Sequence, residues 1–586
     1  MLLAVAGCTS NEPPAPEGDE SAAPSTPPAP PVPSVVFAEP DAELRDVLAG
    51  TAAQTAVQMS STLFEQSPVV VVFARQAETG FDLSDAGITV ASSAAAGLRV
   101  PLLVVGPGGA KPTEVTAELD RLGAETVVGY GDANADWESL AGERALLAGP
   151  TTAEEFESVL GLLVTTAPVP EADVVASISA LGGREHRLLT MTPETPDPAP
   201  AATDSSPEGT PDSSPDATDG TLPAQPALAE LATIEDLPDY APDDQPVDAL
   251  ILAAPSSAPA ALATARAAGA DVQLVTDGDP RSNGATVDAV RARADTAILG
   301  VGDTFGAQDT FAQRVQVAAT AAQLPGGGQT VFPGRRMVAL YGHPSGPSLG
   351  ALGEQGIDET MARVKDLAAQ YQPFSEEPVI PALDLIATVA SAEAGADGDY
   401  SSETTIEELK PWVDAAEEQG VYVVLDLQSG RSDFLSQAKL YEELLARPSV
   451  GLALDPEWRL APGQQPLQQI GSVSAAEVNT VSSWLADLTR DRALPQKLLM
   501  VHQFRIDMID DRASLDVSRT ELAVTLHADG HGTPGEKLET WAALQSVPPE
   551  GIWPSWKNFY DEDKPMLTPE QTYSLMDPKP WLVTYQ

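Results

Sequence analysis

Residues 450–458 read Val-Gly-Leu-Ala-Leu-Asp-Pro-Glu-Trp, a short apolar run that ends in two carboxylates. Successive side chains of a β-strand point to opposite faces, so Leu452 and Leu454 share one face while Asp455 and Glu457 share the other. Bulky groups outside and small or acidic groups inside are typical of a parallel barrel covered by helices. We predict this run to be the fourth strand of such a barrel.

The same pattern recurs along residues 333–586, a length typical of a (β/α)8 barrel. Helical patterns such as Asp358–Tyr371, Ile406–Gln419, Phe434–Ala446 and Ala475–Arg490 separate short apolar runs. The eight predicted strands are Met337–Tyr341, Val379–Leu383, Val421–Leu425, Val450–Leu454, Leu498–Val501, Leu522–Leu526, Ile552–Ser555 and Leu582–Tyr585.

Polar side chains follow the predicted strands at the points where they end. Four of the five histidines and five acids lie there: His343, His502, His527, His531, Asp384, Asp426, Asp455, Glu457 and Asp529. The carboxyl ends of parallel barrel strands meet at one rim, where barrel enzymes place their chemistry. We therefore expect one functional mouth. The alternative is a layer of polar residues that hydrogen-bond to one another and close the barrel.

Two carboxylates on one face raise each other's pKa, which keeps one of them protonated as an acid. The motif Asp455-Pro456-Glu457-Trp458 resembles the end of strand four in chitinase-like and lysozyme-like barrel glycosidases. The resemblance implies that Glu457 protonates the leaving oxygen and that Asp455 orients it or stabilises positive charge. Asp529 or Asp426 would be the facing base or nucleophile.

Other side chains at the rim are expected to bind the sugar. They are His343, Asp384, His502, His527, Trp458, Trp556, Lys557 and Asn558. The glycosidase interpretation requires no cofactor and no metal. Two alternatives remain open: a metal hydrolase that uses His343, His502 and His527 with Asp455 or Asp529, and an adhesin that binds sugars without cutting them.

Two smaller α/β modules, residues 35–191 and 247–332, are predicted before the barrel. Their Rossmann-like or flavodoxin-like pattern of short apolar runs and helices predicts parallel sheets. The predicted strands are Val69–Ala74, Leu102–Gly106 and Thr126–Gly131, then Ala249–Ala254, Val272–Thr276 and Ala297–Gly302. Neither module has a phosphate-binding Gly-x-Gly-x-x-Gly or Walker pattern, so we do not expect a nucleotide.

The third strand of each module runs into the same turn, Gly129-Tyr130-Gly131-Asp132 and Gly300-Val301-Gly302-Asp303. Such a repeat indicates internal duplication. Together with Pro101–Val105 and Leu119–Ala124, the first copy resembles the type 2 cell-wall-binding repeat of Gram-positive surface proteins. The resemblance implies binding to envelope polymers, either cell-wall polysaccharide or peptidoglycan.

The N-terminus resembles that of an actinobacterial-type lipoprotein, because Leu3-Ala4-Val5-Ala6-Gly7-Cys8 is similar to a bacterial lipobox. The resemblance implies lipidation of Cys8 after a signal remnant, residues 1–8. Residues 9–34 predict a disordered tether, and residues 192–246 a disordered, acidic, Pro-rich linker. No apolar stretch is long enough to span a membrane, so any attachment is by lipid. A cytosolic protein with Cys8 as an incidental thiol is the alternative.

The composition excludes several classes of function and of site. The 586 residues carry 86 acidic and 32 basic side chains, a formal charge of −54, which would repel a nucleic-acid backbone. The single cysteine excludes an internal disulfide and a cysteine-based metal site. The sequence therefore predicts an extracytoplasmic, lipid-anchored envelope protein whose barrel hydrolyses or binds an envelope glycan.

Overall fold

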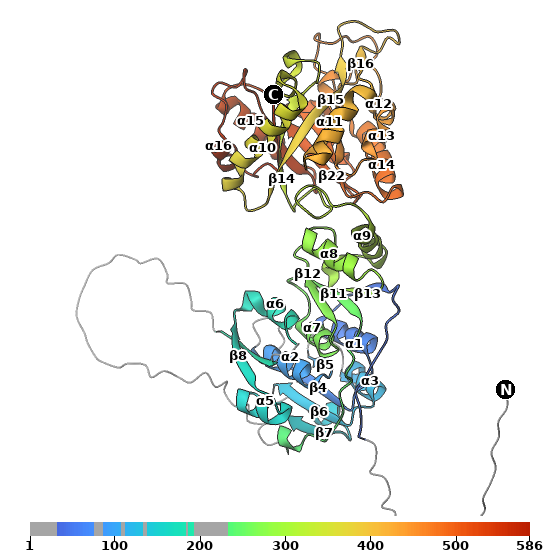
Figure 1. The fold of residues 1–586 in the computed structure, drawn as a ribbon, viewed down its shortest axis with the longest axis vertical. Helices are drawn as coiled ribbons and strands as arrows, with labels where there is room; N and C mark the ends of the chain where they lie inside the picture. The colour runs from blue at the N-terminus through green and yellow to red at the C-terminus, as the bar shows by residue number, and fades with distance from the viewer. Residues whose placement is uncertain (1–31, 76–85, 107–111, 133–136, 183–185, 193–231) are drawn as a thin grey trace, which may run out of the picture.

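The computed structural model describes residues 32–75, 86–106, 112–132, 137–182, 186–192 and 232–586. They form an α/β lobe and a barrel lobe, the lower and upper parts of Figure 1. Cys8, most of the predicted tether and residues 193–231 of the predicted linker lie outside the described residues. Residues 232–246 are described, and they contain β10 (Ala232–Thr233) and a short 3₁₀ turn, Ile234–Asp236.

The α/β lobe contains two parallel sheets, in agreement with the predicted fold class. The first has the order β10-β7-β6-β4-β5 and the second the order β12-β11-β13-β2. The strands of the first sheet are β4 (Val69–Ala74), β5 (Leu102–Val105), β6 (Thr126–Gly131) and β7 (Ala145–Ala148), with β10 at one edge. Those of the second are β2 (Arg45–Leu48), β11 (Ala249–Ala253), β12 (Asp271–Leu274) and β13 (Ala297–Val301).

Each sheet takes an edge strand from the other side of residues 193–231 in the sequence. Strand β2, near the N-terminus, pairs with β13, and β10, after residues 193–231, pairs with β7. Two two-stranded ribbons complete the strands of this lobe. Strand β1 (Val36–Phe37) pairs antiparallel with β3 (Phe64–Gln66), and β8 (Val164–Val169) pairs parallel with β9 (His186–Met191). The two sheets are therefore interlocked.

Three alanine-rich helices fill the space between the sheets: α1 (Ala52–Leu63), α2 (Ala86–Leu98) and α7 (Pro259–Ala267). Their small side chains permit close approach, and one apolar core runs through both sheets. Thr264 on α7 accepts a hydrogen bond from the Leu102 amide (3.0 Å) and donates to the Leu102 carbonyl (3.1 Å). The outer helices are α3 (Pro112–Leu122), α4 (Trp137–Ala141), α5 (Ala153–Leu160), α6 (Val174–Ser179), α8 (Gly284–Ala292) and α9 (Gln308–Thr320).

The barrel is closed and its eight strands are parallel, as predicted. The strand order is β14-β24-β23-β22-β20-β18-β17-β15, and β14 also pairs with β15. The strands are β14 (Arg336–Gly342), β15 (Val379–Ala390), β17 (Tyr422–Leu427), β18 (Val450–Leu454), β20 (Lys497–Gln503), β22 (Leu522–Ala528), β23 (Trp553–Asn558) and β24 (Leu582–Tyr585). At the end of β15 the short β16 (Ser401–Glu403) pairs antiparallel with it.

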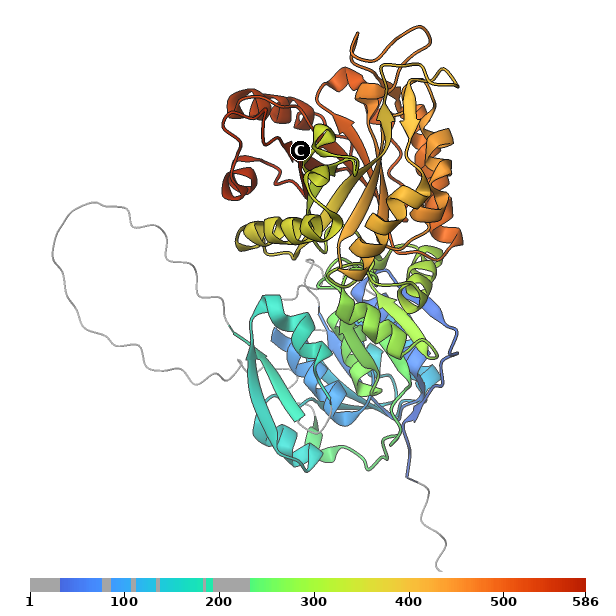
Figure 2. The ribbon, with the colours of Figure 1, turned by 45° about the horizontal axis from the view of Figure 1, so that its top comes forward.

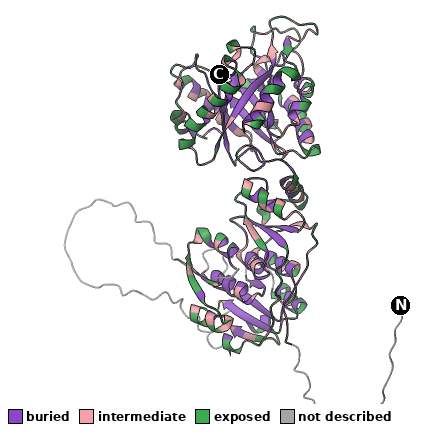
Figure 3. Cartoon of the chain, in the orientation of Figure 1, coloured by how far each residue is buried: buried purple, intermediate pink, exposed green. Residues whose placement is uncertain are grey.

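Helices cover the outside of this barrel, with buried strands inside and exposed helix faces outside (Figure 3). They are α10 (Ile357–Tyr371), α11 (Ile406–Glu418), α12 (Phe434–Leu440), α13 (Glu442–Leu445), α14 (Ala475–Asp491), α15 (Pro534–Gln545) and α16 (Pro569–Leu575). Side chains alternate as predicted. Leu452 and Leu454 pack in the core beneath the helices, whereas Ala453 and Met500 pack in a separate core inside the barrel.

The amino-terminal end of the barrel is closed by the segment that enters it. Leu324, Val331 and Phe332 belong to the inner core, and the Phe332 ring packs 5.6 Å from those of Trp553 and Trp581. This end faces the α/β lobe in Figures 1 and 2, and β16 marks the opposite end. The carboxyl-end mouth therefore points away from the α/β lobe.

Candidate functional site

A short turn places Glu457 at the mouth. Asp455 directly follows β18, and its Oδ1 accepts a hydrogen bond from the Glu457 amide (3.1 Å), which starts a 3₁₀ turn over Pro456–Trp458. Gly471 packs against this turn and donates to the Glu457 carbonyl (2.7 Å). A Cβ at Gly471 would lie 2.4–2.6 Å from the backbone oxygens of Pro456, Glu457 and Arg459, in and just after the turn. The backbone of the turn is thus fixed from both sides.

His502, on β20, lies at the centre of the buried cluster. Its Nδ1 is 2.8 Å from Asp529 Oδ2, and its Nε2 is 3.9 Å from Asp426 Oδ1. Burial lowers the pKa of His502. The charge of Asp426, the hydrogen bond to Asp529 and the charge of Asp455 outweigh burial and raise this pKa to about 10.

Three aspartates surround this imidazole from three neighbouring strands. Asp384 and Asp426 are fully buried, and Asp455 is 3% exposed. Burial raises the pKa of all three carboxyls, and it combines with the charge of Asp426 to bring the pKa of Asp384 to about 7. Both carboxylate oxygens of Asp384 and of Asp426 lack a hydrogen bond of good geometry among the described residues, although the Tyr341 hydroxyl is close enough to Asp426 to lower its pKa by hydrogen bonding, against the effect of burial. The cluster therefore holds more acceptors than this part of the chain satisfies.

Glu457 lies closer to solvent than these aspartates and is half-buried. Burial raises the pKa of Glu457, and the negative charge of Asp529 raises it further. The positive charges of Lys557 and His502 lower this pKa, but their effect is smaller. A carboxyl that is accessible to solvent and has a raised pKa is better suited than an ordinary glutamate to donate a proton to a bound molecule.

A tyrosine and a lysine complete the buried cluster. The Lys557 Nζ lies 3.4 Å from the centre of the Tyr341 ring, and Gln428 Nε2 donates to the Tyr341 hydroxyl (3.1 Å). Burial raises the pKa of Tyr341 well above its usual value, as do the charges of Asp426 and Asp455. The hydroxyl therefore stays protonated, and Lys557 contributes positive charge to an acidic site.

The other histidines have different roles. The ring nitrogens of His527 contact Ser555 Oγ (3.0 Å) and Thr584 Oγ1 (2.9 Å), and burial lowers its pKa well below the usual value. Those of His343 contact Ser345 Oγ and Thr404 Oγ1, both at 2.8 Å. Both rings are thus engaged with hydroxyls, so the metal set of three histidines considered from the sequence is not assembled.

The structure separates two of the expected sugar-binding residues from the mouth. Trp556 packs 5.7 Å from Trp541 beneath the helices, and its Nε1 donates to Asn558 Oδ1 (2.8 Å). Asn558 Nδ2 in turn lies 3.3 Å from Thr572 Oγ1. These two residues face the helix layer because β23 continues through residue 558, so the alternation of faces continues there as well. Trp458 stays beside Glu457 and is half-buried.

Tyr341 and Gln428 were not among the expected site residues. Tyr341 lies on the inward face of β14 and Gln428 directly follows β17 at an inward position, so the alternation that identified Asp384 and Asp426 could also have found them. Their participation depends on tertiary contacts: the hydrogen bond between them and the Lys557 ammonium over the ring.

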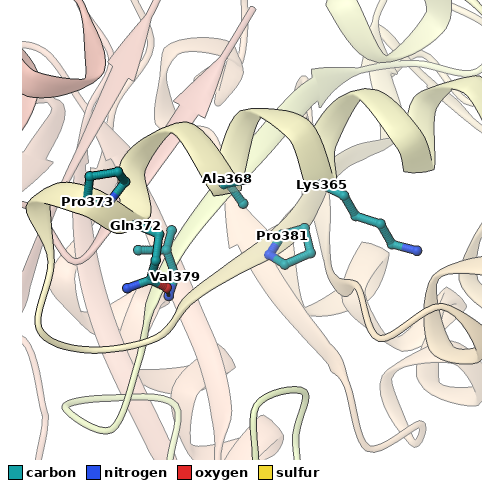
Figure 4. A pocket seen from close by; sticks show the side chains of 7 residues that line it. Lys365, Ala368, Gln372, Pro373, Val379 and Pro381 are labelled. Carbon is teal, nitrogen blue, oxygen red and sulfur yellow. Dashed lines mark hydrogen bonds between the residues drawn. The ribbon is translucent and has the colours of Figure 1, made fainter.

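Two cavities lie away from this cluster. A groove of about 600 Å³ runs between α10 and the start of β15, lined mainly by carbon atoms of Ala368, Pro373, Val379 and Pro381 (Figure 4). A cavity of about 280 Å³ in the α/β lobe lies at the carboxyl ends of β11 and β13, and Ser256 and Asp303 contribute to its lining. No cluster residue lines either cavity.

The chain matches no known protein family and no curated protein sequence. Among solved structures it is similar to Cwp6 from Clostridium difficile, at a TM-score of 0.27 and 12% sequence identity. The likeness covers 70% of this chain and 65% of that one, so the chain spans less than two thirds of Cwp6. Within the described residues, every helix is too short or too polar to cross a membrane.

Proposed function

We propose that the barrel hydrolyses a glycan of the cell envelope, with Glu457 as the proton donor. One observation carries the proposal: an accessible carboxyl with a raised pKa stands at the edge of a buried cluster of acids at the barrel's free end. Cleavage of a glycosidic bond needs one carboxyl that is protonated and a second that is ionised. Glu457 has the properties of the first.

Asp529 is our candidate for the second carboxyl. It directly follows β22, its Oδ2 contacts His502, and its Oδ1 has no hydrogen-bond partner among the described residues. Its negative charge is among the causes that raise the pKa of Glu457. Asp455 would hold the turn that carries Glu457, and Trp458 would offer an aromatic face to a sugar ring.

The α/β lobe and the N-terminus complete the proposal. The interlocked modules would bind cell-wall polysaccharide or peptidoglycan, and a lipid on Cys8 would hold the protein at the outer face of the membrane. No nucleic acid is expected as a partner at a formal charge of −54. Replacing Cys8 with serine should move the protein from the membrane fraction to the soluble fraction.

The test of the barrel is Glu457→Gln in the full chain, assayed on purified wall polysaccharide and on peptidoglycan for new reducing ends. Removing a general acid should lower turnover by roughly 10²–10⁴-fold and leave co-sedimentation with the polymer unchanged. The matched control is Glu418→Gln, the same change on the exposed face of α11. Full turnover by the Glu457 variant would reject the assignment. Binding without turnover by the wild type would favour the adhesin.

A further inference from the structure

The inner part of the cluster has three polar groups that receive no hydrogen bond of good geometry from the rest of the described chain. They are both oxygens of Asp384, both oxygens of Asp426 and Nε2 of His502. All three side chains are fully buried. Buried carboxylates without donors are unfavourable unless a partner is supplied, and each such group calls for an explanation.

These groups converge on one point. One ligand atom from each of Asp384, Asp426 and His502 lies within 4.8 Å of the other two. Donor atoms around a single ion at about 2.1 Å are roughly 3–4 Å apart, so a closing movement under about 1 Å would bring them into place. The three residues lie on β15, β17 and β20, rigid strands of the barrel.

The surroundings of His502 fit a metal ligand. Its Nδ1 is 2.8 Å from Asp529 Oδ2, which leaves the other nitrogen, Nε2, directed toward Asp426. Metal-binding histidines nearly always donate their second N–H to a carboxylate, a backbone carbonyl or a water, which fixes the tautomer and the ring, and Asp529 can be that partner here. The His527 ring packs edge-on at 4.9 Å and also restricts rotation.

We propose that Asp384, Asp426 and His502 Nε2 bind a divalent transition-metal ion. Two carboxylates with one imidazole suit Zn²⁺ or Mn²⁺, whereas Ca²⁺ and Mg²⁺ prefer sites made of oxygen alone. Three protein ligands leave a coordination position for water or another molecule, as in catalytic rather than structural zinc sites. Glu457 is not a ligand of this metal site, and metal binding does not depend on which substrate the barrel takes.

The competing occupant of His502 Nε2 is a proton, which would make the cluster an internal ion-pair network. Measuring the metal content of the protein distinguishes a bound metal ion from a bound proton at His502 Nε2. Full-length protein stripped with a chelator is titrated with Zn²⁺ and, separately, Mn²⁺, and bound metal is measured by elemental analysis and calorimetry. We expect one tight equivalent of at least one of these ions and weaker binding of Ca²⁺ or Mg²⁺.

Three variants make the test specific to the site. Asp384→Asn should abolish the tight equivalent, and Asp529→Asn should keep the stoichiometry but weaken affinity by roughly 10–100-fold. The control is Asp397→Asn, an exposed member of the acidic group Asp397, Asp399 and Glu403, which should change nothing. The Glu457→Gln variant should also bind the ion normally. Metal binding can therefore be tested even if the barrel turns out not to be a hydrolase. No tight equivalent in the wild type, or the same equivalent in Asp384→Asn, overturns the inference.

Discussion

Replacing Asp384 with asparagine should stabilise the metal-free barrel at pH 8. Burial and the charges of Asp426 and Asp529 raise the pKa of Asp384 from 3.8 to about 7. The positive charges of His502 and Lys557 oppose this rise but do not cancel it. A carboxyl whose pKa is higher in the folded state destabilises the fold as pH rises from 3.8 to 7. About three pKa units at 1.36 kcal/mol each give an upper bound of about 4 kcal/mol. We expect a gain of about 2–4 kcal/mol at pH 8, falling to about 0.5 kcal/mol near pH 4.

The assay is urea unfolding with EDTA present, followed by tryptophan fluorescence at pH 4, 6 and 8. Seven of the eight tryptophans belong to the barrel, so the signal reports this lobe. Asp366→Asn, the same change on the exposed face of α10, should have no effect at any pH. If Asp384→Asn destabilises the barrel at pH 8, the Asp384 carboxylate has a stabilising partner, which would contradict the inference that its oxygens lack one.

Three other substitutions test the fold and the site. Thr264→Val leaves the buried amide and carbonyl of Leu102 without their partner and should cost about 1–3 kcal/mol in thermal unfolding, whereas Thr264→Ser should keep most of the stability. Gly471→Ala should displace the turn that carries Glu457 and lower turnover at least tenfold, with circular dichroism unchanged. Burial opposes ionisation of Glu377, but hydrogen bonds from Arg336 and Ser375 prevail and lower its pKa to about 2. Glu377→Gln should therefore cost about 1–2 kcal/mol at pH 7, a loss that fades as pH falls from 4.5 toward 2.

The barrel could be predicted from the sequence because its strands alternate bulky and small side chains. The same alternation predicted that Asp384, Asp426, Asp455 and His502 would converge, since the carboxyl ends of parallel strands meet at one rim. It failed where a strand's length was misjudged. Strand β23 was expected to end at Ser555, and its three further residues turn Trp556 outward.

Other features required the tertiary structure. Strand β2, Arg-Asp-Val-Leu, is too short to show a period, and its partner β13 lies about 250 residues away. His343 follows Gly342, whose φ of +149° ends the alternation of β14, so its ring meets Thr404 instead of the cluster. The cation over the Tyr341 ring joins β14 to β23, at opposite ends of the barrel sequence.

The most direct test of the proposed function is a crystal structure of the Glu457→Gln variant with an oligosaccharide prepared from the cell wall. We predict a sugar bound across the mouth, with its glycosidic oxygen within hydrogen-bond distance of the amide at position 457 and one ring against Trp458. A sugar bound away from this mouth, or oriented with its glycosidic oxygen far from position 457, would contradict the assignment of the proton donor.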